Sequence, residues 1–260
     1  MSTHTDRTLR ARLMMLVTLC ALLAAPSVAG AAGTGDAVRP APDRLTPTEA
    51  KTRAEDEARY KDWAGSLTTA AVRPLVRRGS ISPQIVDGPY RYMWTPSHAQ
   101  QRSYWCGPAT CQIIADYWGP CPSQLDLAQH LGTTSGGTDF TRVDDVLRAF
   151  TGKQYWYYGG IRSESSFLSY VGYGIMSKHY PIVADVHIFA SVWPYYNFDH
   201  AGHIIPLDAY DSRYGTIRIN DPYAESAWRA GGGNTYSHTT YSHDVIWNGV
   251  ANHPLRAVIR

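Results

Sequence analysis

The sequence lacks a strong charge of either sign. Its 24 Lys and Arg residues almost balance its 22 Asp and Glu residues, and the small excess of basic residues falls within residues 1–29. A chain without a basic patch gives no reason to expect nucleic acid or an anionic membrane as a partner. With 260 residues and 44% hydrophobic content, it is long enough for one good-sized globular domain with extensions.

Long apolar runs are also scarce. The only candidate, residues 13–25, reads LMMLVTLCALLAA, and is short against the roughly 20 residues that span a bilayer. Three arginines precede this run and small residues follow it, which is the layout of a secretory signal peptide. We therefore expect residues 1–29 to be a signal peptide, and the protein to be secreted, extracellular and free of membrane contact after cleavage. The candidate cleavage positions are Ala29, Ala31 and Ala32.

Several common functional motifs are missing. No internal repeat is visible, and the glycine-rich stretch 132–140 lacks the preceding strand and the Lys-Ser/Thr pair of a phosphate-binding loop. His200 and His203 have metal-ligand spacing, with Asp199 or Asp211 as a third ligand, but no HExxH motif accompanies them. We expect no metal and no cofactor.

Cysteines are few, and their number is informative. Cys20 lies in the predicted signal peptide, which leaves three cysteines for an oxidising compartment. Cys106 and Cys111 are poorly placed to pair, because five residues along a helix turn their side chains to different faces. Cys111 and Cys121 can meet if the chain reverses at residues 118–120. This predicts a Cys111–Cys121 disulfide and leaves Cys106 as the unbridged thiol.

Cys106 stands at the start of a predicted helix, in the segment WCGPAT. From Ala109 onward, apolar residues recur at helical spacing until Gly119, a natural helix end. The positive end of a helix dipole favours a thiolate, so this position suits a nucleophile. A disulfide half and a buried small side chain are the alternative interpretations of this position.

A thiolate nucleophile needs a base, and His203 has the most suggestive setting of the ten histidines. It opens an apolar, strand-like run, and Asp221 ends the next predicted strand. A turn near residues 211–215 between antiparallel neighbours would bring Asp221 beside His203 as the orienting acceptor. Gln100, six positions before Cys106, can supply an amide N–H to a developing oxyanion, although Gln101 lies next to it.

The chain divides into three segments. After the signal peptide, residues 30–84 read as a linker followed by a helix that runs from Pro47 to about Thr69, with a thin apolar stripe that predicts weak docking. This helix is either a removable pro-segment or an N-terminal helix packed on the domain. In residues 85–260, helical patterns come first, among them a short helix from Pro122 to Gly132. Short strand patterns come second and read IVADVHIF, GHIIPLDAYD, TIRIND and PLRAVIR. This order indicates an α+β domain in two lobes.

The ordered set of Gln100, Cys106, His203 and Asp221 resembles papain-like cysteine peptidases, most of all cysteine peptidase family 39 and its bacteriocin-leader-processing relatives. The resemblance implies a papain-like two-lobed fold, with a helical lobe carrying the nucleophile helix and an antiparallel β lobe carrying the His and Asp. It also implies Cys106 as nucleophile, His203 as base, Asp221 as orienter and Gln100 as oxyanion donor. The leader-processing enzymes are fused to membrane transporters, and no transporter sequence is visible here.

We therefore predict a secreted cysteine hydrolase, most simply a peptidase acting on a peptide or protein substrate as a monomer. Transfer of the acyl group to an amine would use the same residues. We expect Trp105, Trp193 and Tyr195 to contact substrate, although the aromatic run 193–198 fits a packed loop equally well. The alternative function is a catalytically silent papain-like binding or interaction module with an aromatic groove.

Overall fold

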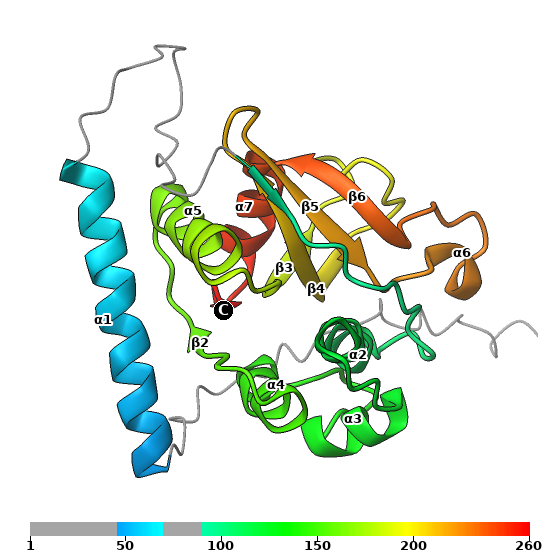
Figure 1. Ribbon diagram of the computed structural model, residues 1–260. Helices are drawn as coiled ribbons and strands as arrows, with labels where there is room; N and C mark the ends of the chain where they lie inside the picture. The colour runs from blue at the N-terminus through cyan, green and yellow to red at the C-terminus, as the bar shows by residue number, and fades with distance from the viewer. Residues whose placement is uncertain (1–45, 70–89) are drawn as a thin grey trace, which may run out of the picture. The chain divides into compact units, whose positions relative to one another are not determined.

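The computed structural model describes residues 46–69 and 90–260, and all of them belong to one compact unit, Ala31–Arg260. Figure 1 shows how their helices and strands are arranged. The helices are α1 (Pro47–Thr69), α2 (Cys106–Trp118), α3 (Gln124–Leu131), the 3₁₀ turn η1 (Phe140–Arg142), α4 (Val143–Thr151), α5 (Glu164–Gly172), the π-helical turn η2 (Tyr173–Lys178), α6 (Glu225–Trp228) and α7 (His243–Asn252). The strands are β1 (Tyr90–Tyr92), β2 (Tyr157–Tyr158), β3 (Ile182–Ile188), β4 (His200–Asp211), β5 (Thr216–Asp221), β6 (Ser237–Ser242) and β7 (Val258–Ile259).

All strand pairs of the described sheet are antiparallel. Their order is β2-β7-β3-β4-β5-β6, and β1 pairs with the far end of β4, beyond the part that β3 occupies. β4 is the longest strand and lies between β3 and β5. The predicted hairpin therefore forms, since β4 and β5 are neighbours joined by a turn at residues 212–215.

Helices cover both faces of this sheet, which explains the apolar content of its central strands. Alternate residues of a strand point to opposite faces. On β3, Ile182, Ala184 and Val186 pack in the core with α5 and α7, whereas Val183 packs in the core with α2, α3 and α4. In Figure 1, α2 to α4 lie on one side of the strands and α5 and α7 on the other. The α+β class and the separation of a helical lobe from an antiparallel sheet are as predicted.

Local signals set the helix ends that frame the site. α2 begins at Cys106 and ends at Gly119, whose φ of 119° few other residues adopt. α3 begins after Ser123, whose side chain accepts the backbone N–H of Asp126, and ends at Gly132 in the left-handed conformation. The predicted Cys106 helix and the helix ending at Gly132 are both confirmed.

The predicted N-terminal helix forms as α1 but docks by a different means from the one expected. Its apolar stripe is thin, yet Asp56 is almost fully buried. The Asp56 carboxylate accepts hydrogen bonds from the hydroxyls of Tyr158 and Tyr173 and lies 3.0 Å from Arg260 Nη1 and 2.9 Å from Lys178 Nζ. A buried, fully partnered carboxylate therefore joins α1 to the domain.

Some predictions fall outside the described residues: the signal peptide at 1–29, the linker before α1, and the start of the domain near Ile85. Strands β3, β4, β5 and β7 match the predicted strand patterns, whereas β1, β2, β6 and α7 were not predicted. Within residues 46–69 and 90–260, every helix is too short or too polar to cross a membrane.

Candidate active site

Cys106 is the first residue of α2 and is fully buried. Trp105 precedes the helix and provides no side-chain cap, so the first N–H groups of α2 are not capped by that residue. The next residue is Gly107, and the loop at residue 138 packs directly against it. Only glycine fits here, because a Cβ atom would clash with the Thr138 side chain. The sequence around Cys106 thus places a thiol at the positive end of a helix whose first turn is tightly packed.

His203 and Asp221 meet across the β4–β5 hairpin, as the spacing predicted. His203 Nε2 lies 2.8 Å from Asp221 Oδ1, and both side chains are fully buried. Because Nε2 is engaged by the carboxylate, Nδ1 is the ring nitrogen left for Cys106. This division of the two nitrogens is what a nucleophile, base and orienter need.

Asp221 is held by two more donors. The backbone N–H of Tyr223 donates to Oδ1 over 2.8 Å, and the hydroxyl of Tyr196 donates to Oδ2. Tyr196 is buried, and its ring also lies edge-on to that of His203. Tyr196 sits in the aromatic run 193–198, but its position there gave no signal that it, rather than its neighbours, would reach the acid.

The charges around His203, which come from Asp221 and Cys106, favour a protonated imidazole. Burial lowers the pKa of His203, but the Asp221 carboxylate and Cys106 raise it, and the net result is a pKa of about 10. The imidazolium form of His203 is therefore favoured well above the usual histidine range. Such a ring can stabilise an adjacent thiolate and can later give up a proton to a leaving group.

Gln100 lies in the segment that leads into α2 and is buried. Its backbone N–H donates to the carbonyl of Pro222, directly after Asp221, and its Nε2 donates to the carbonyl of Arg102 over 2.8 Å. An amide carries two N–H groups, so one remains after the bond to Arg102. Gln101 is exposed, and its backbone N–H is bonded to Gln124 Oε1. Of the two neighbouring glutamines, the buried one is therefore Gln100, the predicted oxyanion donor.

Trp105 lines a pocket of about 330 Å³ beside the start of α2. The indole is largely buried, and the Arg102 guanidinium lies over its ring at 4.7 Å from the centroid. The pocket lining also includes Leu125 and Gln129 of α3. That Trp105 contacts substrate stays a prediction, which this pocket supports.

The predicted substrate contact at Trp193 has no accessible surface in the structure. Its indole is fully buried and packs among the core residues of the sheet and α7, because the loop folds back after β3. Tyr195, in contrast, is 61% exposed and has a φ of 80°, which is unusual for a tyrosine. Of the two aromatic residues, only Tyr195 is accessible to a substrate.

The predicted Cys111–Cys121 disulfide is not present in the structure, in which none of Cys106, Cys111 and Cys121 is bridged. Cys111 points into the core formed by α2, α3 and α4 and is fully buried, whereas Cys121 is exposed. The chain does reverse after Gly119, but the two sulfurs face different surroundings. Burial, with a smaller effect of Cys106, raises the pKa of Cys111 strongly, so this thiol is inert packing.

A buried thiol at a helix N-terminus beside a His–Asp pair on an α+β scaffold is the arrangement of papain-like cysteine peptidases. The profile of a family described as the Peptidase_C39 like family matches residues 90–252, which is more than half of the chain. The protein belongs to this family. Comparison with curated protein sequences gives no match.

Several solved structures are similar in fold at low identity. A C39-like peptidase from Bacillus anthracis is 13% identical with a TM-score of 0.44, over 65% of this chain and 96% of that one. Xylellain, a cysteine protease from Xylella fastidiosa, is 10% identical with a TM-score of 0.45, over 66% and 83%. A double glycine motif protease from an AMS/PCAT transporter, solved with its leader peptide, is 12% identical with a TM-score of 0.40, over 67% and 94%.

Proposed function

We propose that the protein is a cysteine peptidase that acts through Cys106, His203, Asp221 and Gln100. The observation that carries this proposal is the geometry of His203: its Nε2 is bonded to Asp221, and it interacts with Cys106 at the N-terminus of α2. Family membership supports the same reaction class. A purely structural cysteine would need neither a buried histidine nor an acid behind it.

The residues divide the chemistry as follows. The Cys106 thiolate attacks the substrate carbonyl carbon, and the new oxyanion accepts hydrogen bonds from Gln100 Nε2 and from the backbone N–H of Cys106. The His203 imidazolium then protonates the leaving amine, which departs and leaves an acyl-thioester on Cys106. A water molecule, deprotonated by His203, attacks the thioester, releases the acid and restores the thiol. An amine in place of this water would give acyl transfer.

Burial is the observation that favours a second candidate function. Cys106 and His203 are both fully buried, so a carbonyl reaches the sulfur only if neighbouring side chains move. A protein that kept the fold but only bound peptides, through the Trp105 pocket and exposed aromatic residues such as Tyr195, would tolerate a closed site. This is the catalytically silent module, and it predicts no reaction at Cys106.

Mass spectrometry after treatment with an epoxide thiol inhibitor separates the two functions. The peptidase should gain an adduct on Cys106 that is lost in His203→Ala. The exposed Cys121 serves as an internal control, because an adduct there that survives His203→Ala reports accessibility alone. An unmodified Cys106 in folded protein would support the binding module.

We also propose that the protein is secreted, on the basis of the signal-peptide pattern at residues 1–29, and that α1 stays with the catalytic domain. The buried Asp56 and its four partners support the second point, because releasing α1 would break all four interactions and remove the carboxylate that pairs with Arg260. Mass measurement of protein recovered from culture medium would show whether residues 46–69 remain. Profiling a peptide library with the same material would define the cleavage preference.

A further inference from the structure

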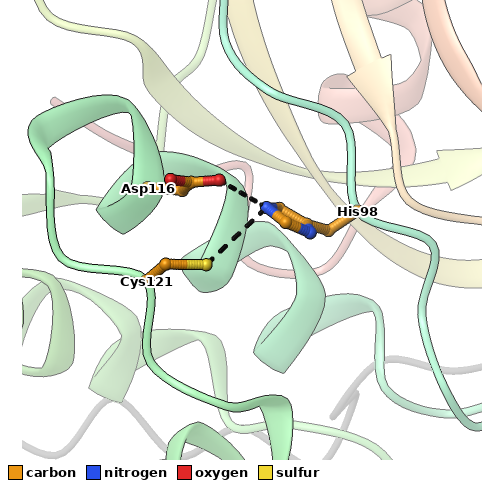
Figure 2. Close-up of side chains that lie close together, drawn as sticks. All are labelled: His98, Asp116 and Cys121. Atoms are coloured by element: carbon orange, nitrogen blue, oxygen red, sulfur yellow. Dashed lines mark hydrogen bonds and ion pairs between the residues drawn. The ribbon is translucent and has the colours of Figure 1, made fainter.

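A second group of Cys, His and Asp side chains lies outside the active site. His98 is in the segment before Gln100, Asp116 is near the end of α2, and Cys121 follows that helix. Figure 2 shows the three side chains pointing toward one another from these three places. Their ligand atoms all lie within 4.8 Å of one another.

Asp116 and Cys121 both contact the same ring nitrogen, His98 Nε2. His98 Nε2 lies 2.7 Å from Asp116 Oδ2 and 3.9 Å from Cys121 Sγ. A catalytic relay needs both ring nitrogens, one for the nucleophile and one for the acid, and this group offers only Nε2 to both neighbours. Asp116 also hydrogen-bonds the Cys121 thiol, so the three side chains contact one another pairwise.

A cation between the three side chains could be bound by all of them at once. With Cys121 as thiolate, Asp116 as carboxylate and His98 neutral, the three ligands carry two negative charges, which a divalent ion balances. In a tetrahedral zinc site the ligand bonds are about 2.0–2.3 Å, which sets ligand atoms roughly 3.3–3.6 Å apart. His98 Nε2 lies closer than this to Asp116 Oδ2 and farther than this from Cys121 Sγ, so ion binding requires the side chains to adjust around the ion.

The ligand types select the ion. Thiolate and imidazole are soft and borderline ligands that suit Zn²⁺, whereas Ca²⁺ and Mg²⁺ prefer oxygen alone. The Gln112 amide also points its Nε2 toward Cys121 Sγ at 3.9 Å while it donates to the carbonyl of Pro122 at 2.9 Å. Such donors around a coordinated sulfur orient it and moderate its charge.

From this geometry we propose that His98, Asp116 and Cys121 form a site for a divalent transition-metal ion of the Zn²⁺ type, completed by water. The site joins the segment that carries Gln100 to the helix that carries Cys106. Its role is structural, and the site does not depend on turnover at Cys106. Figure 2 shows how the three ligands come from separate parts of the chain, which is the arrangement in which a bound ion restrains their relative positions.

Cobalt titration of the Cys106→Ala protein, under reducing conditions, tests the site. Cys106→Ala removes a second thiol that lies beside a histidine, and Cys111 is buried. We expect one equivalent of Co²⁺ to produce a near-ultraviolet thiolate-to-cobalt absorption band, and Zn²⁺ to abolish it. The band should disappear on the additional change Cys121→Ser and weaken in His98→Ala.

A second cluster in the described part of the chain supplies the matched control. Glu164, His243 and Asp244 also place three ligand atoms together, but without sulfur. Asp244→Asn should therefore leave the cobalt band unchanged. Absence of the band, its survival in Cys121→Ser, or its loss in Asp244→Asn alone would overturn the proposal.

Labelling of Cys121 gives a readout that needs no variant at the site. In the Cys106→Ala protein, Cys121 is the exposed thiol of residues 46–69 and 90–260, so iodoacetamide should modify it readily in the absence of metal. Stoichiometric Zn²⁺ should slow this reaction at least about tenfold, and a chelator should restore it. Equal labelling rates with and without Zn²⁺ would contradict metal ligation by Cys121.

Discussion

The domain contains two groups built from the same three residue types, Cys, His and Asp, and they differ in how the histidine is used. His203 gives Nε2 to Asp221 and keeps Nδ1 for Cys106, inside a fully buried site. His98 presents Nε2 to both Asp116 and Cys121, on a partly exposed surface. In the first arrangement each ring nitrogen has its own partner, so the histidine can transfer a proton from the thiol. In the second arrangement one ring nitrogen faces both partners, as it would around a bound ion. Residue type alone therefore does not identify the nucleophile.

The largest expected effect separates the two cysteines. Cys106→Ala should abolish peptide hydrolysis while leaving the melting temperature and the far-ultraviolet circular dichroism close to wild type, because alanine fits the buried space of a thiol. In Cys121→Ser protein, the epoxide adduct should still form on Cys106. Loss of folding in Cys106→Ala would make this residue structural and remove the distinction.

The next effect concerns the acids. Asp221→Asn should lower kcat/KM by about a thousandfold to ten-thousandfold, the size of the loss in comparable triads. Asp221 helps to hold the pKa of His203 at about 10, so the protonated ring persists as pH rises from 6.5 toward 10 in the native protein. Without the carboxylate, the alkaline limb of the pH–rate profile should move to lower pH. The stabilisation that the charged pair contributes is present below pH 6.5 and is lost as pH approaches 10.

Asp116→Asn provides the comparison for that experiment. Asp116 bonds to His98, and no hydrogen bond or ion pair joins it to His203 in the described part of the chain, so the position of the alkaline limb should not shift. A shift of equal size in both variants would mean that the pH dependence does not arise at His203. The pH dependence of the epoxide reaction at Cys106 offers an independent check on the same point.

A smaller effect is expected at the oxyanion donor. Gln100→Ala should lower kcat by about a hundredfold, the usual cost of removing one such donor, with less change in KM. The exposed neighbour supplies the control, since Gln101→Ala removes a side chain that faces solvent. The opposite result, with damage only in Gln101→Ala, would place the oxyanion donor one residue later than the structure indicates.

The smallest effect should come from Tyr196→Phe. This change removes the hydroxyl that donates to Asp221 Oδ2 but keeps the buried ring. A hydrogen bond to a charged group is worth ~1.5 kcal/mol or more, so kcat/KM should fall about tenfold and the alkaline limb should shift slightly. An unchanged rate and pH profile would show that Tyr223 N–H and His203 alone are enough to fix the carboxylate.

Helix periodicity and strand spacing, which depend on residues close together in the sequence, predicted those parts of the site that the backbone positions. Cys106 was placed by helix periodicity, and the pairing of His203 with Asp221 followed from counting residues across one antiparallel turn. These relations survive because a helix start and a hairpin register are set by nearby residues.

Predictions that required the direction of a side chain were less successful. Trp193 looked like a groove residue but fills the core, and Tyr196, three positions later, reaches Asp221 instead. Cys111 and Cys121 are close enough in sequence to pair, yet one faces the core and the other faces His98. Side-chain direction in loops depends on packing between distant segments, which periodicity does not contain.

The end of the chain has a practical consequence for protein production. The match to the family stops at residue 252, but β7 pairs with both β2 and β3 beyond that point, and Trp156 and Arg260 exchange two backbone hydrogen bonds. The Arg260 side chain is fully buried beneath α1, among the rings of Tyr60, Tyr158, Tyr170 and Tyr173. A fragment cut at the family boundary loses a strand from within the sheet. An affinity tag therefore belongs before α1 rather than directly after Arg260.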